Sequence, residues 1–232
     1  MTPLGWLTDT AALYARVFRR GAVLAVRNWQ VGLALIVYAA LFEVALVVAA
    51  PLGILGGFLI YLVMVACVSS ALSLVDGVIR AGRAGFADIA SGFTAYLNDL
   101  LTVGFLVFGL RLIGNLLLPR ESLPWFVFEL AVLVFLNAVP ELIYLGRFQA
   151  AELLLASYRF IGENWIEWFP ATAVLIMVVL LAAQVPPGPF GVFQAVTVGT
   201  VLAFTMIVRG LLFLELTSSS RRGREFRRRA AG

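Results

Sequence analysis

The sequence predicts an all-α integral membrane protein in which six transmembrane helices form three tandem helical hairpins, each preceded by a cytoplasmic amphipathic surface helix. Two observations carry this prediction. Hydrophobic residues make up 62% of the 232 residues and charged residues only 13%, whereas a soluble domain of this length needs far more polar surface. The apolar runs are long and continuous, which is typical of spanning helices and not of the alternating strands of a membrane barrel.

Three apolar runs each begin just after an asparagine and end at a proline. The bounding pairs are Asn28 and Pro51, Asn98 and Pro119, and Asn164 and Pro186. The members of a pair are 23, 21 and 22 residues apart, and at about 1.5 Å per helical residue each run covers roughly 33 Å, close to one bilayer core. We therefore interpret residues 1–218 as a single membrane domain with internal repetition. Its predicted repeats are residues 8–75, 86–145 and 149–216.

The first repeat opens with a surface helix over residues 8–27. Its apolar side chains recur at helical spacing on one side and arginines occupy the other, which is the pattern of a helix lying on a membrane. Asn28 stands where the chain turns into the first span, from about Val31 to Ala50, so we expect its side chain to cap that span. Trp29 is expected at the level of the lipid headgroups. The second span ends near Val75.

The second repeat is expected to follow the same order. A surface helix covers the segment from Phe86 to Leu97, and Asn98-Asp99 caps the third span, from about Leu100 to Leu118. The fourth span, from about Trp125 to Leu145, contains Pro140. Because proline has no N–H and its ring crowds the preceding turn, we expect this span to kink there.

The third repeat contains the clearest copy of the junction between surface helix and span. A surface helix is predicted from about Gln149 to Glu163, and Asn164 with Trp165 then opens the fifth span, which ends near Gln184. The sixth span runs from about Phe190 to Leu216. The tail, residues 219–232, carries six arginines and is expected to be a poorly ordered, basic, cytoplasmic segment.

Arginine supplies all 17 basic residues, and its placement predicts the orientation of the chain. Fourteen arginines lie in the N-terminal segment, the two loops between hairpins and the tail, whereas an outer turn contains only Arg120. By the positive-inside rule both termini face the cytoplasm, in a multi-pass protein of the cytoplasmic (inner) membrane. The N-terminus has no short apolar core followed by a small-residue cleavage site, so we expect the first span to direct membrane insertion.

Among the charged residues inside the predicted spans, five are candidate site residues: Glu43, Arg111, Glu129, Glu141 and Arg209. A charge near the bilayer centre costs a few kcal/mol unless it is paired or hydrated. Glu43 and Arg111 occupy similar depths in equivalent helices, and Glu129 enters the fourth span at a comparable level. We therefore expect Arg111 to pair with Glu43 or with Glu129. Glu141 and Arg209 occupy equivalent places in two repeats and form a second candidate pair.

Two interpretations of these charges remain open. The pairs can hold helices in register, which is the common role of buried ion pairs. Alternatively they line a polar pathway for an ion, a proton or a small solute, which Asn115, Asn137 and Gln184 would extend. Single amides in spans more often join helices to one another.

The residue types present exclude several kinds of chemistry. Histidine is absent and cysteine occurs once, at Cys67, so we expect no metal site, no cofactor and no histidine-dependent nucleophile. Without lysine, a phosphate-binding loop with its usual lysine is also excluded.

Asp76-Gly77-Val78-Ile79-Arg80 resembles the start of the signature of CDP-alcohol phosphatidyltransferases. Only Asp76 and Asp88 fall in the window where that family needs four aspartates, so a lipid-modifying enzyme is the weakest of our hypotheses.

The segment Phe160-Ile161-Gly162-Glu163-Asn164-Trp165 carries a second resemblance. Together with the surface helices and tandem hairpins, it resembles a loose group of bacterial multi-pass membrane proteins of unknown function. That group includes the membrane domain attached to some glycerophosphodiester phosphodiesterases. The catalytic part of those enzymes is a separate soluble domain with histidines and acids, so the resemblance implies architecture and no activity.

These observations favour a non-enzymatic membrane protein that serves as a scaffold or accessory subunit of a membrane complex, or organises lipid. The alternative is a small permease or transporter subunit for a solute or ion that uses the buried charges between helices. The expected partners are membrane lipids, with anionic headgroups at the arginine-rich face, and other membrane-protein subunits. Nucleic acid is not an expected partner.

Overall fold

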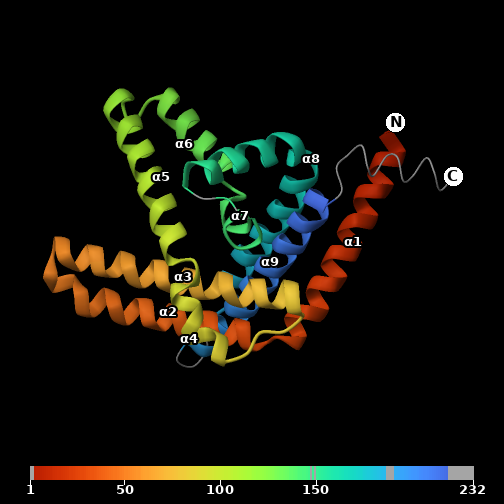
Figure 1. Ribbon diagram of the computed structural model, residues 1–232, viewed down its shortest axis with the longest axis horizontal. Coiled ribbons are helices and arrows are strands. Elements are labelled where there is room, and N and C mark those ends of the chain that lie inside the picture. The colour runs from red at the N-terminus through yellow and green to blue at the C-terminus, as the bar shows by residue number, and fades with distance from the viewer. Residues whose placement is uncertain (1–2, 147, 149, 187–190, 219–232) are drawn as a thin grey trace.

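A computed structural model describes residues 3–146, 148, 150–186 and 191–218. Within those residues the regular secondary structure is all helical, with nine α-helices, one short 3-10 helix and no strand (Figure 1). The predicted basic tail at 219–232 and most of the third outer turn, at 187–190, lie outside the described residues.

Six helical segments are long enough and apolar enough to cross a membrane. They are Gln30–Leu52, Ile54–Ala81, Ala87–Leu117, Leu123–Leu145, Ala151–Ala183 and Val192–Ser218. Each has 23 to 33 residues, and about 20 are needed to cross the hydrocarbon core. The chain is therefore a multi-pass membrane protein with an all-α fold, as the composition predicts.

The first helix, α1 (Pro3–Arg27), runs alongside the last helix, α9 (Val192–Ser218), in the opposite direction (Figure 1). Leu13 and Val17 on α1 are buried, whereas its arginines are exposed. The expected helix is present, but the expectation that its apolar face rests on lipid is wrong in part. Much of that face packs against α9 instead.

Helices α2 (Gln30–Ala49) and α3 (Ile54–Ala81) form a hairpin whose turn projects from the rest of the protein (Figure 1). The turn consists of a 3-10 helix, Ala50–Leu52, and Gly53, whose φ of +57° suits a residue without a side chain. Large apolar side chains around the turn are exposed, including Val48, Ile54 and Phe58. The far half of this hairpin is therefore available to lipid or to a partner.

Helix α4 (Ala87–Ala95) packs along α3, and α5 (Leu97–Leu117) leaves it in a new direction. Gly92 permits the contact, since a Cβ at this position would lie 3.0 Å from the Cα of Ser70. Ser69 Oγ donates to Gly92 O (2.8 Å), and Ser70 Oγ donates to Ile89 O (2.9 Å). The apolar face of this predicted surface helix, which was expected to lie on the membrane, packs largely against protein instead.

The fourth span is broken into α6 (Leu123–Phe135) and α7 (Val139–Leu145). The expected kink is present as a three-residue turn at 136–138, and Pro140 lies in the first turn of α7. Proline fits there because the first residues of a helix do not need their N–H groups for the helical ladder. The break leaves backbone carbonyls available to other elements.

Helix α8 runs without interruption from Ala150 to Ala183 and changes direction along its length (Figure 1). The expected boundary at Asn164, between a surface helix and a separate span, is therefore wrong. Helix α8 contacts α5, α6 and α7, and it packs extensively on α9. Helix α9 is the centre of the core, and its fully buried side chains include Ile207, Val208 and Leu212.

Candidate functional site: a buried intramembrane ion pair

Glu141 on α7 and Arg209 on α9 form an ion pair inside the helical body. Arg209 Nε donates to Glu141 Oε1 at 2.6 Å, and Nη2 donates to Oε2 at 3.0 Å. The side chains are only 4% and 15% exposed. A guanidinium that meets both oxygens of one carboxylate makes the strongest form of this interaction, and burial weakens its screening by water.

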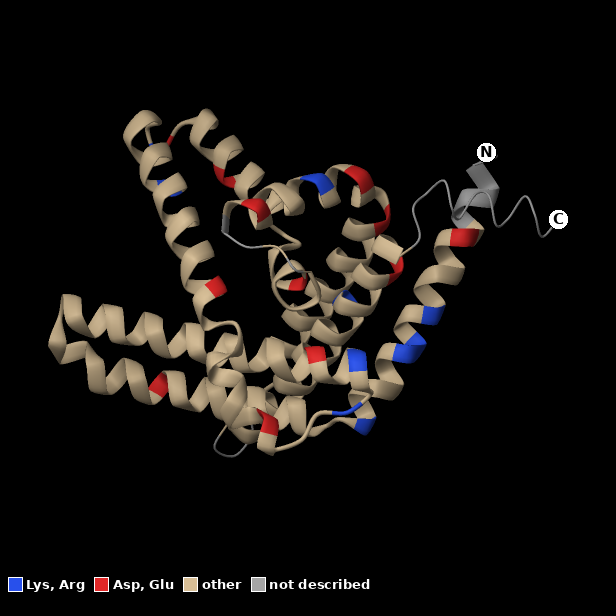
Figure 2. Ribbon diagram, viewed as in Figure 1, with Lys and Arg blue, Asp and Glu red and all other residues tan. Residues whose placement is uncertain are grey.

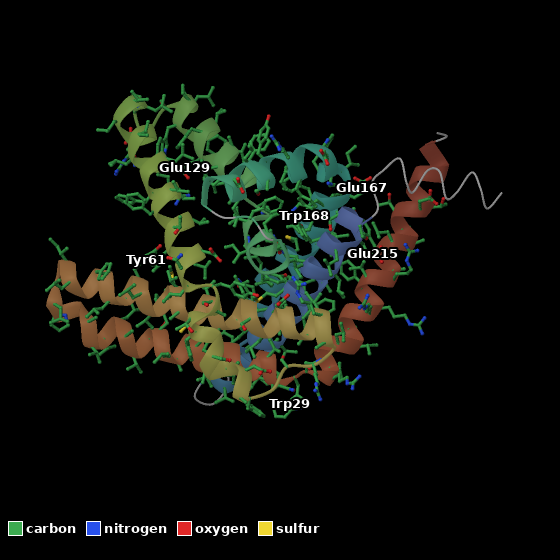
Figure 3. All side chains as sticks on the ribbon, in the orientation of Figure 1. Trp29, Tyr61, Glu129, Glu167, Trp168 and Glu215 are labelled. Atoms are coloured by element: carbon green, nitrogen blue, oxygen red, sulfur yellow. The ribbon has the colours of Figure 1, made fainter. Side chains whose placement is uncertain are left out.

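Two further groups complete the surroundings of Arg209. Its Nη2 donates to the backbone oxygen of Asn137 (2.7 Å), and its Cζ lies 5.0 Å from the ring centre of Trp168. The Trp168 indole N–H donates to Asn137 Oδ1 at 2.8 Å. Figure 3 shows Trp168 in the interior, among α7, α8 and α9. We call Asn137, Glu141, Trp168 and Arg209 the buried network.

The break in the fourth span explains why the network forms here. Pro140 has no N–H, so the helical ladder cannot continue through the turn at 136–138. The carbonyl of Asn137 accepts from Arg209 instead, and the carbonyl of Phe135 accepts from Ser157 Oγ on α8 (2.7 Å). Polar side chains of α8 and α9 thus bind the backbone that the broken helix exposes.

A second pair joins α5 to α6. Arg111 Nη2 donates to Glu129 Oε2 at 2.9 Å, so the structure selects Glu129 from the two partners that the sequence left open. These side chains are 50% and 29% exposed, in clear contrast to the buried network. Nearer the outer turn, Arg120 Nε donates to Asn115 Oδ1 at 2.8 Å. Gln184 lies at the exposed end of α8 and joins neither pair.

Glu43 is brought to neither pair. It is exposed on α2, within an apolar stretch. Its side chain forms no ion pair or hydrogen bond with the residues that the structure describes.

The expected capping role of Asn28 is wrong, although the residue is buried at the junction of α1 and α2. Its Nδ2 donates to Leu24 O (2.9 Å) and Gly82 O (3.3 Å), and its Oδ1 accepts from the Ala84 amide (3.0 Å). Asn28 therefore holds the loop after α3 against the start of the first hairpin. The adjacent Trp29 is exposed at the edge of the molecule, as an interfacial tryptophan would be (Figure 3).

The other two expected caps are also wrong. Asn98 is exposed within the first turn of α5, and the amide of Tyr96, which precedes that helix, donates to Ser69 Oγ at 2.8 Å. Asn164 is buried within α8 and donates to Phe160 O at 3.0 Å, an interaction that an asparagine inside a helix can make with the preceding turn. Trp165 is exposed.

Two features of the site were not anticipated. Trp168 received no role, although a tryptophan within an apolar run needs an acceptor for its N–H. The second span was expected to end near Val75, but α3 continues to Ala81 and holds Asp76 and Arg80 as an ion pair one turn apart. Arg80 also donates to Tyr144 O (3.1 Å), which ties α3 to α7.

Two open grooves flank the C-terminal end of α9. The larger, about 1150 Å³, lies among α7, α8 and α9, with Arg159, Glu152 and Glu163 among its lining residues. The smaller, about 640 Å³, lies between α1 and α9 and includes Arg16, Arg20 and Glu215. Neither is lined by Glu141 or Arg209. In the described part of the chain, no group of three or more metal-ligating side chains is gathered.

Comparison of the chain with protein-family models, with curated proteins and with solved structures finds no match. The geometry of the site is therefore the basis for the function proposed below.

Proposed function

We propose that the protein is a non-enzymatic scaffold or accessory subunit of a membrane complex, which also organises the lipid around it. The observation that carries this proposal is the closed geometry of the buried network. Arg209 is engaged by a carboxylate, a carbonyl and an aromatic face at once, and Glu141 is 4% exposed. Because Glu141 and Arg209 neutralise each other and are enclosed by protein, their role in this proposal is to hold α7, α8 and α9 together.

The proposed architecture has three tandem units, each a cytoplasmic helix followed by a hairpin, over residues 8–75, 86–145 and 149–216. In the third unit the cytoplasmic helix and the span are one bent helix. The pairing of Glu141 with Arg209 supports this repetition, because the two residues occupy equivalent places in the second and third units. Both termini lie on the cytoplasmic side of a bacterial inner membrane, where arginines predominate.

The scaffold function is further supported by the two projecting hairpins. Around their turns α2–α3 and α5–α6 expose large apolar side chains. The far half of α2–α3 carries a single charged residue, Glu43, whereas α5–α6 also carries Arg111, Arg120, Glu121 and Glu129 (Figure 2). On the other side of the protein, Arg16, Arg19 and Arg20 lie exposed along α1. Apolar hairpins suit lipid tails or partner helices, and exposed arginines suit anionic headgroups.

A small permease or transporter subunit for a solute or ion is the second candidate. One observation favours it: the larger groove reaches Leu142, which follows Glu141 in the chain. A solute would have to separate Glu141 from Arg209 to pass between α7 and α9. Each separated charge would then be buried without its partner, at a cost of several kcal/mol.

Purification from native membranes in a mild detergent tests the proposal. A scaffold or accessory subunit is expected to recover another membrane protein in a fixed ratio that survives a second purification step. Recovery of the chain alone, together with solute or ion uptake by proteoliposomes that Glu141→Gln abolishes, would favour the permease and contradict the scaffold.

A further inference from the structure

Glu43 is an acidic residue that has no counter-charge among the described residues of its own chain. It lies eight residues before Pro51, about 12 Å of helix from the outer turn, in the exposed part of the first hairpin. An ionised carboxylate in this position costs about 2.5 kcal/mol or more in lipid if it has no partner. The described residues of its own chain supply none.

Arg111 is placed to be that partner in another copy of the chain. It also lies eight residues before the proline of its outer turn, Pro119. Helices α2 and α5 are both the first helix of a hairpin, so in a six-span topology both run from the cytoplasmic to the outer side, although their axes diverge in the structure (Figure 1), and Glu43 and Arg111 stand the same number of residues before their outer turns. The two residues carry opposite charges at equal distances along their helices from the outer turns, on two exposed helix faces.

Arg111 also has hydrogen-bonding capacity left. A guanidinium has five N–H donors, and the bond to Glu129 uses one of them. Half of the Arg111 side chain is exposed, so a second carboxylate can reach it without displacing Glu129.

The side chains one turn away are complementary in size. Ala39 and Ala40 are exposed on α2 beside Glu43, and Phe108 is exposed on α5 beside Arg111. Small residues let a neighbouring helix approach closely in a membrane. Ala40 and Phe108 both lie eleven residues before their turn prolines, so in such a contact the aromatic ring would be placed to meet the small side chain.

The two faces cannot meet within one chain. The hairpins α2–α3 and α5–α6 diverge from the body of the protein (Figure 1). A two-fold axis along the membrane normal preserves the depth of every residue and the outward or inward sense of every helix, and it would allow α2 of each copy to lie against α5 of the other.

We infer that the protein forms a two-fold symmetric homodimer in the membrane, in which Glu43 of each copy binds Arg111 of the other. Each interface then holds an acid–arginine–acid group made of Glu43, Arg111 and Glu129. The inference rests on the six-span topology and is independent of the scaffold function.

Charge exchange in the full-length chain tests this interface, with the monomer–dimer equilibrium measured in lipid nanodiscs or by single-molecule photobleaching in vesicles. Glu43→Arg alone is expected to weaken dimerisation on the order of tenfold or more, the range of a lost interhelical polar contact in a membrane. The double exchange R111E/E129R keeps the pair within each copy but sets two acids opposite each other, and it should weaken the dimer similarly. Adding Glu43→Arg to that double exchange should restore it.

Crosslinking tests the depth match with the native charges in place. In a Cys67→Ala background, chains with Ala40→Cys and chains with Phe108→Cys are co-expressed under different tags. Oxidation should join the two kinds of chain, whereas Leu33→Cys, which is exposed on α2 but two turns further from the outer turn, should not join to Phe108→Cys. A wild-type monomer at every concentration, a dimer indifferent to the exchanges, or crosslinking only from position 33 would each overturn the inference.

Discussion

Removal of the Arg209 side chain gives the sharpest stability prediction. Arg209→Leu leaves Glu141 buried without a counter-charge and leaves the carbonyl of Asn137 without its donor. It removes two bonds to the carboxylate, one to the carbonyl and the contact with Trp168. Loss of one partner of a buried ion pair costs about 3–5 kcal/mol, most of it because the other charge remains buried.

The double variant E141L/R209L separates this effect from the value of the pair itself. With both charges replaced by apolar leucines, no buried charge is left unpaired, and the Asn137 carbonyl loses its donor as it does in the single variant. Its free energy of unfolding is expected to lie within about 1–2 kcal/mol of the wild type, since replacing a whole buried pair by apolar residues is often neutral or stabilising. The resulting coupling energy of several kcal/mol would identify the two residues as one structural unit.

Reversible unfolding of the purified protein in mixed micelles, followed by circular dichroism and tryptophan fluorescence, measures these differences. Arg111→Leu is the matched control. Within one chain it removes a single hydrogen bond from a side chain that is 50% exposed, so about 1 kcal/mol or less is expected for the monomer in micelles. Equal losses for Arg209→Leu and Arg111→Leu, or a double variant as unstable as the single one, would refute the reasoning.

Three further predictions concern the packing around the hairpins. Asn28→Ala should lower the free energy of unfolding by about 2–3 kcal/mol, because it leaves the buried carbonyl and amide of the loop after α3 without their partners. The same variant should speed proteolysis of residues 82–86, and unchanged cleavage would count against this role of Asn28. Gly92→Ala should lower the stability by about 1–3 kcal/mol, since a Cβ at this position would overlap α3. Gly57→Ala is the control: its Cβ meets open space, so the change should be neutral or slightly stabilising. Equal effects of the two variants in thermal unfolding would contradict the close contact of α4 with α3. Burial, with the nearby Glu167, raises the pKa of Tyr14 above its ordinary value, so the neutral phenol is favoured in the folded state. Its contribution to the docking of α1 is therefore complete below about pH 10 and declines as the pH rises through the raised pKa, and Tyr14→Phe should abolish that alkaline dependence in a pH titration of stability.

The spans and the choice of charged partners were predictable because a bilayer imposes strict conditions on a sequence. A helix must stay apolar for about 20 residues, and these runs are uninterrupted, so their number and approximate limits could be predicted. Charges within spans require partners, which limited Arg111 and Arg209 to a few candidates. Between Glu43 and Glu129, the one that lies in the adjacent helix of the same hairpin pairs with Arg111.

The junctions were not predictable, because one residue type can satisfy several kinds of neighbour. An asparagine before an apolar run can cap a helix, but Asn28 binds a distant loop and Asn164 binds the preceding turn of its own helix. Similarly, the apolar face of an amphipathic helix has the same pattern whether it meets lipid or protein. Leu13 and Val17 are buried in protein, and only the tertiary structure reveals it.

The buried network was half predictable. The pairing of Glu141 with Arg209 followed from the cost of isolated charges, whereas the contributions of Trp168 and the Asn137 carbonyl depend on the break in the fourth span. Pro140 indicated that break. The sequence did not indicate which side chains of other helices would bind the exposed carbonyls.

Partner recovery with the E141L/R209L chain tests the central claim most directly. If the buried network is a structural lock within a scaffold, this variant should recover the same membrane protein from native membranes, in the same ratio as the wild type. A variant that folds and unfolds like the wild type but no longer recovers its partner, or that loses a transport activity present in the wild type, would contradict that claim.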